Sequence, residues 1–373
     1  MIPYLDLKAQ YRSIKDEVDA AVLRVLDSTQ FVLGDEVTAF EREFAAYCQA
    51  AETVGVNSGT SALHLALLAA GIGPGDEVIT SPFTFVATVA AIRYAGATPV
   101  LVDIEPDYFT IDTSKIEAAI TVRTRAIIPV HLYGQCADMP AIKQIADRHK
   151  LRVIEDNAQA IDAAGGGFRI GELSDATATS FIIQKNLGTF GDGGALITND
   201  SDIDTKLRKL RNHGSNKRNV HSFGFNSRLD DLHAGVLSAK LKHIHGWNDH
   251  RITWATRYTA GLSGATHFDL PYARPGYRHV FHLYVIETKN PAHRDQLVDS
   301  LVANGIDAKT HYSIAIHKQD GYPWGKGARL AGPVPNAERN AASCISLPMY
   351  PELTEAEVDY VISKVLEWDK APK

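Results

Sequence analysis

A lysine stands between an apolar segment and a glycine-rich loop in the middle of the chain. Residues 179–200 read TSFIIQKNLGTFGDGGALITND, so Lys185 follows a strand-like run and precedes four glycines. Glycines let a backbone turn sharply and approach a ligand closely. Partial burial would lower the pKa of the Lys185 amine and make it nucleophilic, as Schiff-base chemistry requires. The ordinary alternative is a surface lysine before a glycine turn, and this motif alone does not exclude it.

A carboxylate stands upstream, at the expected end of another strand. Asp156 lies in VIEDNAQA, residues 153–160. Ligands of open α/β sheets bind outside the carboxyl ends of the strands. A carboxylate there can pair with a protonated pyridine nitrogen and so maintain an aromatic cofactor ring as an electron sink. Taken alone, Asp156 is explained equally well as a helix N-cap.

Two further segments have residues suited to the phosphate and the flat ring of a cofactor. In GVNSGTSALHLAL, the small residues 58–61 open an amphipathic helical pattern. Free N–H groups at a helix N-terminus, together with short hydroxyl side chains, bind phosphate. In SPFTFVAT, Phe85 follows a strand and is placed to stack on a flat ring. The alternatives are ordinary helix capping for residues 58–61 and core packing for Phe85.

These segments belong to an alternation of strand-like and helix-like stretches. Strands are predicted over 78–82, 98–104, 126–134, 152–157, 177–183 and 194–200, and helices over 61–70, 86–95 and 140–149. Ile14, Val18, Val22 and Val25 recur at helical spacing and predict an N-terminal helix. Alternation with few charges in the strands predicts an α/β fold, with a mostly parallel central sheet covered by helices on both faces.

The pattern changes after about residue 210. The polar segment NHGSNKRNVHSFGFNSRLDD predicts an exposed loop or a site, and a long helix is expected over 229–258 with a bend at Gly246. Beyond it a strand is predicted over 280–288, and helices near 292–304 and 354–367. We therefore predict a large cofactor-binding domain, 1–250, that includes the N-terminal helix, and a smaller C-terminal α+β domain, 251–373.

Composition narrows the class of protein. The 373 residues are 45% hydrophobic and 22% charged, with a net charge of −6, which disfavours a nucleic-acid partner. The three cysteines form no CxxC pair and the 15 histidines show no metal-ligand spacing, so neither disulfides nor a metal site are predicted. The N-terminus lacks a signal-peptide pattern and no apolar run is long enough to span a bilayer. We expect a cytoplasmic enzyme without a membrane partner.

In their order and spacing the segments resemble the DegT/DnrJ/EryC1/StrS family of nucleotide-sugar aminotransferases, which depend on pyridoxal 5'-phosphate (PLP). The similarity runs through essentially the whole chain and includes the motifs IPYLDLKAQY, NSGTSALHLAL, VIEDNAQA, KNLGTFGDGGALITND, GFNSRLDDLHAGVL and ISLPMYP. The resemblance implies PLP as the cofactor and the PLP-dependent transferase fold type I, which is the aspartate aminotransferase fold.

The resemblance also implies a role for each matching residue. Lys185 corresponds to the catalytic lysine that binds the cofactor covalently and later moves a proton between cofactor and substrate. Asp156 corresponds to the partner of the pyridine nitrogen, and Gln159 to the amide that bonds the phenolic oxygen of the ring. Phe85 corresponds to the stacking aromatic. Four positions correspond to those that hold the phosphate: Gly59, Thr60, Ser61 and Ser180.

Partners and substrates follow from the same resemblance. Asn226 corresponds to an asparagine that reaches the phosphate of the neighbouring subunit, which implies a homodimer with shared active sites. The amino donor is expected to be L-glutamate and the acceptor a keto sugar linked to a nucleotide, with a preference for a dTDP-3-keto-6-deoxyhexose. The alternatives are a 4-keto or UDP-linked sugar, a cyclitol, and a homologue that binds PLP without turnover.

Some residues are expected near the substrate, and some depart from the family pattern. Arg228, His311 and Tyr312 are candidates for substrate contacts, and Lys217 and Arg218 for the diphosphate. Three positions differ from what many members have there: Ile161 replaces a histidine, Gln184 breaks a P-x-K sequence, and Ser313 replaces a proline. None of these departures removes a cofactor group, so they bear on which substrate is used.

Overall fold

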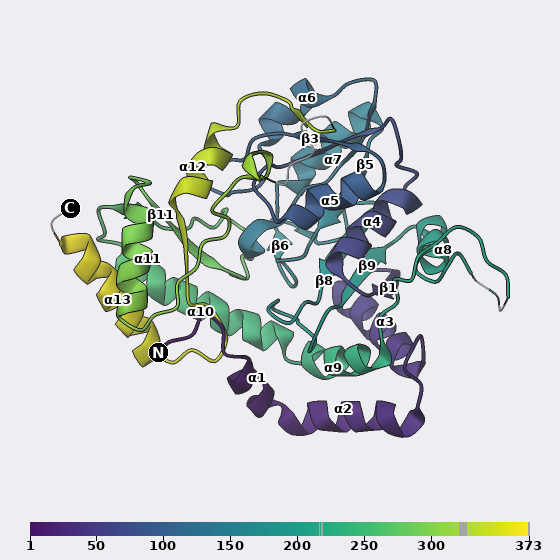
Figure 1. Cartoon of the computed structure of the whole chain (residues 1–373), viewed down its shortest axis with the longest axis horizontal. Coiled ribbons are helices and arrows are strands. Elements are labelled where there is room, and N and C mark those ends of the chain that lie inside the picture. Colours follow the sequence, from purple (N-terminus) through teal and green to yellow (C-terminus); the bar gives the residue numbers. More distant parts are fainter. Residues whose placement is uncertain (216, 218, 321–326, 372–373) are drawn as a thin grey trace.

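An eight-stranded sheet forms the centre of the molecule (Figure 1). The computed structural model describes residues 1–215, 217, 219–320 and 327–371. The strand order is β1-β9-β8-β5-β4-β2-β3-β12, in which β9 runs antiparallel to both neighbours and the other pairs are parallel. The strands are β1 Glu52–Val56, β2 Glu77–Thr80, β3 Thr98–Leu101, β4 Thr124–Ile127, β5 Arg152–Asp156, β8 Ala176–Ser180, β9 Gly194–Thr198 and β12 Arg329–Leu330. The predicted α/β fold with a mostly parallel sheet is confirmed.

Helices cover both faces of this sheet. Successive side chains of a strand point to opposite faces, so neighbouring residues of one strand pack against different helices. On β9, Leu196 packs in a cluster with α4, α5 and α8. Its neighbours Ala195 and Ile197 pack on the other face with α3 and α9, and α7 covers β4 and β5 on that side. These helices are α3 Asp35–Cys48, α4 Gly59–Ala69, α5 Val86–Tyr94, α7 Met139–His149, α8 Ser201–Leu210 and α9 Asp231–Leu241.

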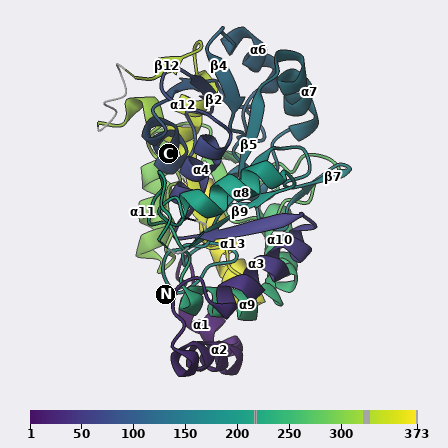
Figure 2. The same cartoon turned by 90° about the vertical axis from the view of Figure 1, so that its right-hand side faces the viewer.

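The N-terminal helix is confirmed, although it is interrupted. Ile14 separates α1, Leu7–Ser13, from α2, Lys15–Ser28. Ile14, Val18 and Val25 are buried in the cluster that α3 and α9 share. Figures 1 and 2 show α2 at the edge of the molecule, below α9.

The C-terminal part forms a second layered unit. A three-stranded antiparallel sheet joins β10 Phe268–Asp269, β11 Tyr284–Thr288 and β13 Cys344–Leu347. Helices pack against it around a separate apolar core, which also takes in Ile2 from the N-terminus. They are α10 Ile244–Leu262, α11 His293–Ala303 and α13 Glu355–Lys370, while α12 Pro335–Ser343 packs against β11 in another apolar cluster. The boundary at residue 250 stays a prediction, and α10 runs across it.

Three expectations differ from the structure. The helix predicted over 229–258 is two helices, α9 and α10, which are separated by residues 242 and 243. The predicted bend at Gly246 is wrong: this glycine lies in the first turn of α10, where an added β-carbon would meet no atom within 4 Å. The strand predicted over 126–134 ends at Ile127, before Pro129, which has no N–H group to donate. The strand β1 was not predicted.

Shorter elements complete the described part of the chain. They include the helix α6 Ile116–Ala119 and the two-stranded hairpin of β6 Ala164–Gly165 and β7 Phe168–Arg169. Of the helices in the described ranges, none combines the length and apolar character needed to cross a membrane. The cytoplasmic location stays a prediction.

Candidate active site

Three strands that are distant in sequence end at one edge of the large sheet. β5 ends at Asp156 and β8 at Ser180, and both strands run in the same direction. β1 runs antiparallel to β9, which runs antiparallel to β8, so β1 also ends at this edge and leads into α4. Lys185 follows β8 in a turn, where its backbone N–H donates to the carbonyl of Ile182 at 2.9 Å. The topology therefore collects the residues that the sequence singled out.

The start of α4 forms a narrow cradle beside Ser180. Ser58 is the N-cap, and its Oγ accepts from the backbone N–H of Ser61 at 3.1 Å. An added β-carbon on Gly59 would lie 2.6 Å from the β-carbon of Ser180. Only glycine therefore allows the first turn of the helix to lie this close to the end of β8. The first-turn N–H groups of a helix lack intrahelical partners, so Gly59, Thr60, Ser61 and Ser180 suit an anionic group.

Asp156 is a buried carboxylate in a fixed orientation. Thr88 Oγ1 donates to its Oδ2 at 2.8 Å, and the backbone N–H of Ala158 donates to its Oδ1 at 3.2 Å. Burial raises the pKa of Asp156, while the hydrogen bonds and the positive charge of Lys185 act in the opposite direction. No helix begins after Asp156, so the alternative that it is a helix N-cap is wrong. Thr88, in the first turns of α5, was not predicted.

The Lys185 side chain is half-buried and lies near the carboxylate of Asp156. Burial lowers the pKa of the Lys185 amine to about 8, and the negative charge of Asp156 opposes this shift in part. Within the described ranges, Lys185 Nζ has no hydrogen bond or salt bridge to another side chain. The charge of Lys185 in turn contributes to lowering the pKa of His282 and of His311. Lys185 is therefore a desolvated amine that is poised for nucleophilic attack.

Gln159 and Tyr312 form a polar wall next to the lysine. Gln159 Oε1 accepts from the backbone N–H of Tyr133 at 2.7 Å, and its Nε2 donates to the hydroxyl of Tyr312 at 3.0 Å. Because the Tyr312 oxygen accepts this bond, its own proton stays available to a ligand. The ring of Phe85 lies 6.0 Å from that of Tyr312. Phe85 is 55% exposed, so the core-packing alternative is wrong and its ring is accessible to a ligand.

Two histidines complete this wall. His311 lies 2.9 Å from the Ser346 hydroxyl through Nδ1, and burial lowers its pKa to about 4, so the ring is neutral near pH 7. His282 was not singled out from the sequence. It lies 2.9 Å from Asn186 Oδ1, and burial holds its pKa well below the usual range. Both rings therefore offer neutral hydrogen-bonding groups near the lysine.

Of the remaining predicted residues, the structure places only Arg228 beside the cradle. Asn226 is exposed and forms a backbone bridge to Asn212. Arg228 donates to Asn212 Oδ1 at 3.3 Å and lines the same pocket as Ser58, at the outer end of the cradle. Lys217 is exposed, and Arg218 lies outside the described residues. Figure 1 shows the chain after α8 projecting away from the sheet.

The three departures from the family pattern have different surroundings. Ile161 is buried in the apolar cluster with Phe181 and Trp247, so it packs in the core. Gln184 and Ser313 are exposed. No hydrogen bond of Gln184 or Ser313 to a cofactor-facing side chain is present in the part of the chain that the structure describes.

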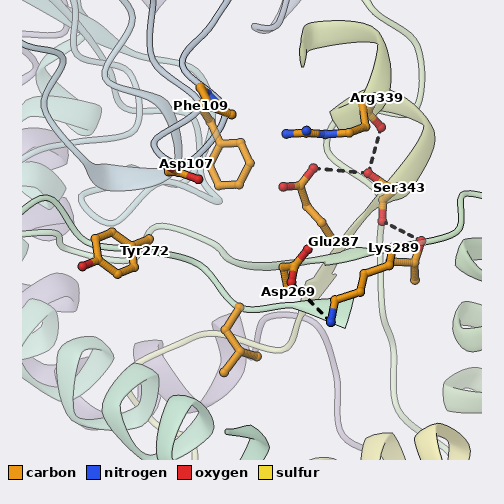
Figure 3. A pocket seen from close by; sticks show the side chains of 11 residues that line it. Asp107, Phe109, Asp269, Tyr272, Glu287, Lys289, Arg339 and Ser343 are labelled. Atoms are coloured by element: carbon orange, nitrogen blue, oxygen red, sulfur yellow. Dashed lines mark hydrogen bonds and ion pairs between the residues drawn. The ribbon is translucent and has the colours of Figure 1, made fainter. Parts of the chain in front are cut away.

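A separate cavity of about 610 Å³ lies between β11, α12 and the loop at residues 106–109 (Figure 3). Glu287 Oε1 accepts from the Ser343 hydroxyl at 3.2 Å, and burial raises the pKa of Glu287 to about 7. No residue that the sequence singled out lines this cavity. Among the described residues, no group of three His, Cys, Asp or Glu side chains is arranged to hold a metal ion.

Comparisons with known proteins identify the family of the chain. A model of the DegT/DnrJ/EryC1/StrS aminotransferase family matches residues 12–366. The chain belongs to this family. Its curated relatives include a dTDP-3-amino-3,4,6-trideoxy-alpha-D-glucose transaminase of Streptomyces venezuelae, which is 46% identical and aligned over 98% of this chain and 96% of that protein.

A second curated relative differs from the first in the sugar nucleotide that it is named for. It is a UDP-N-acetyl-3-dehydro-alpha-D-glucosamine 3-aminotransferase of Acidithiobacillus ferrooxidans, 45% identical over 96% of this chain and 95% of that protein. Among solved structures, S. venezuelae DesV in complex with a ketimine intermediate superposes with a TM-score of 0.96 at 46% identity. The superposition covers 100% of this chain and 99% of that one, so the aminotransferase fold is shown for the whole chain.

Proposed function

We propose that this chain is a PLP-dependent aminotransferase that moves an amino group from L-glutamate to the keto group of a nucleotide-linked deoxy sugar. The observation that carries the proposal is the placement of the Lys185 amine against Asp156, beside the cradle of Gly59 and Ser180. A family of PLP-dependent enzymes and a relative solved with a ketimine both support this cofactor. When bound, PLP supplies the electron sink that lets an amino group move between carbons.

The residues present fit that cofactor. The cradle is a space that a β-carbon at position 59 would fill, and it would hold the phosphate of PLP through Gly59, Thr60, Ser61 and Ser180. Asp156 would keep the proton on the pyridine nitrogen, because a buried carboxylate stabilises a facing cation. Gln159 Nε2 would orient the phenolic oxygen, and the Phe85 ring would cover one face of the cofactor and exclude water from it.

Lys185 has two tasks in this proposal. Its neutral amine binds the cofactor, and a pKa near 8 leaves a useful neutral fraction close to neutral pH. As a free amine, Lys185 would also be placed to accept a proton from a substrate carbon and to return it. The neutral rings of His282 and His311 add no competing positive charge.

The proposal includes a homodimer with shared sites. Asn226 is exposed and bridges to Asn212 shortly after α8, which is a placement that would let its side chain serve a neighbouring subunit. Arg228, at the outer end of the cradle, would meet the diphosphate of the sugar nucleotide, and His311 and Tyr312 would contact the sugar.

We propose a dTDP-3-keto-6-deoxyhexose as the acceptor, which the S. venezuelae relative supports. A UDP-linked 3-keto sugar is the second candidate, because the A. ferrooxidans relative is almost equally similar. A 4-keto sugar, a cyclitol and a homologue without turnover are further alternatives that the experiment separates.

The test is a mass-spectrometric screen of keto sugars with L-glutamate as the donor. Holoenzyme is mixed with dTDP-linked and UDP-linked 3-keto and 4-keto sugars, generated in place, and with a keto-cyclitol. Formation of the dTDP-3-amino sugar, with loss of the visible cofactor absorbance on addition of L-glutamate alone, is the expected result. Lys185→Ala is the matched control. The proposal would be overturned if the protein could not be loaded with PLP, or if the visible absorbance of the holoenzyme did not change on addition of L-glutamate.

A further inference from the structure

A second lysine is buried against the segment that follows Lys185. Lys240 lies in the last turn of α9 and its side chain is 0% exposed. Its Nζ donates to Gln10 Oε1 at 2.9 Å and to the carbonyl oxygen of Gly188 at 2.6 Å, and it lies 4.3 Å from the centroid of the Phe190 ring. Within the described ranges no carboxylate is within salt-bridge distance of it, and Glu352 acts only from further away. Burying a charged amine without an ion-pair partner costs free energy, which suggests that Lys240 has a specific role.

The carbonyl that Lys240 holds belongs to the point where the Lys185 turn closes. An added β-carbon on Gly188 would lie 2.5 Å from the carbonyl oxygen of Ile183. The backbone before Lys185 and the backbone after it therefore touch at Gly188. A displacement of Gly188 would open the turn that carries the Lys185 amine.

Helices α9 and α10 hold the chain after Lys185 at three successive places. Asn186 Nδ2 donates to Asn248 Oδ1 at 2.7 Å, Gly188 accepts from Lys240, and the Thr189 hydroxyl lies 3.0 Å from His233 Nδ1. Lys240 binds the middle of this segment. Through Gln10 it also connects the segment to α1, which lies far away in sequence.

We propose that Lys240 is a positioning residue for Lys185: by holding the Gly188 carbonyl it keeps the turn closed and the Lys185 amine out of water. The inference rests on the proposed function only in taking Lys185 as the reactive amine. Asp156, His282 and His311 are the titratable groups that face Lys185, and none of them bonds to Lys240. Loss of Lys240 would therefore act on Lys185 through the shape of the turn.

The test compares wild-type protein with Lys240→Met, which removes the N–H donors and preserves most of the apolar volume. Both are measured without cofactor. The pH midpoint for labelling of Lys185 by an amine-reactive reagent is read by mass spectrometry, and hydrogen exchange is followed over residues 183–190. The midpoint is expected to rise from about 8 towards the ordinary value of 10.5, since hydration of the amine removes the cause of its lowered pKa. Exchange in the segment is expected to accelerate about tenfold or more as the turn opens.

Three further variants make the comparison decisive. Lys240→Arg retains donors and charge and is expected to restore both readings towards wild type. Lys242→Met removes an exposed lysine two residues away, and Val236→Ala destabilises the same helix without touching Gly188, so neither should move the readings. If Lys240→Met does not fold, Lys240→Gln is read in the same way.

Unchanged labelling and exchange in the folded Lys240 variant would overturn the positioning role. This outcome is distinct from failure of the proposed function, which would appear in wild-type protein as an inability to capture PLP on Lys185. The labelling comparison stays decisive in that case, because it uses no cofactor.

Discussion

The β-carbon that an alanine would place at residue 59 lies 2.6 Å from the β-carbon of Ser180. Through this pair the start of α4, which follows β1, meets the end of β8, a strand that is far away in sequence. The absence of a side chain at residue 59 therefore leaves room for the first turn of α4 to approach the strand, and for an anion to reach its N–H groups.

Gly59→Ala is expected to weaken PLP binding by roughly ten- to a hundredfold, because overpacking typically costs about 1–3 kcal/mol. The measurement is the dissociation constant of PLP from equilibrium titration of cofactor-free protein. Gly246→Ala is the control, since an added β-carbon there meets no atom within 4 Å. Equal affinity in the two variants would contradict the assignment of the cradle.

The pKa of Lys185 should respond to Asp156. The negative charge of Asp156 favours the protonated amine and raises its pKa, so Asp156→Asn should lower the pKa below about 8. Labelling of Lys185 at pH 7 would then become faster than in wild-type protein, because more of the amine is neutral. The profile is measured in cofactor-free protein by peptide mass spectrometry. Glu287→Gln, in the separate cavity, should leave it unchanged, and a rise on Asp156→Asn would refute the coupling.

Shared sites predict that two inactive variants rescue each other. Lys185→Ala and Asn226→Ala homodimers should each show little activity. After mixing and subunit exchange, half of the dimers are mixed and each has one intact site, so roughly a quarter of wild-type activity should return in a two-fold symmetric dimer. The L-glutamate half-reaction is followed by absorbance. Absence of recovery, with exchange verified by native mass spectrometry, would argue against the role of Asn226.

Glu287 should make stability depend on pH in an unusual direction. Its pKa is raised from 4.5 to about 7 in the folded protein, so the unfolded chain releases this proton first as the pH rises. Stability is thus lost between about pH 4.5 and 7, by at most about 3 kcal/mol. Glu287→Gln should remove this loss and be relatively more stable above pH 7. Denaturant unfolding at pH 5 and pH 8 measures it, and parallel pH profiles would contradict it.

The sequence was most informative where a local pattern sufficed. The α4 start, the strand ending at Asp156 and the turn at Lys185 all follow from residue type and spacing, and the structure places them together. Strand β1 is hard to predict because ETVGV is short and runs directly into the small residues at the start of α4, so it does not stand out as a separate element. Glycine disfavours helix and so predicts a bend at Gly246, yet the break lies at residues 242 and 243, three to four residues earlier.

Other site residues depend on distant contacts that no local pattern encodes. Thr88 is ordinary in sequence and becomes important only because α5 places it 2.8 Å from Asp156. Tyr133 acts through a backbone N–H on Gln159, so its side chain gives no signal. His282 lies two residues before β11, beside Asn186. Such partners can be found only once the elements are packed together.

The pairing of β1 with β9 has a consequence for how the enzyme is made. Val54 pairs with Leu196, so the edge of the sheet that supports the cradle joins the start of the chain to a strand synthesised much later. A growing chain on the ribosome cannot complete this edge before Thr198 has emerged. If the cradle holds a phosphate as proposed, the early nascent chain would lack that site, and a cofactor would stabilise the fold only after this long-range pairing has formed.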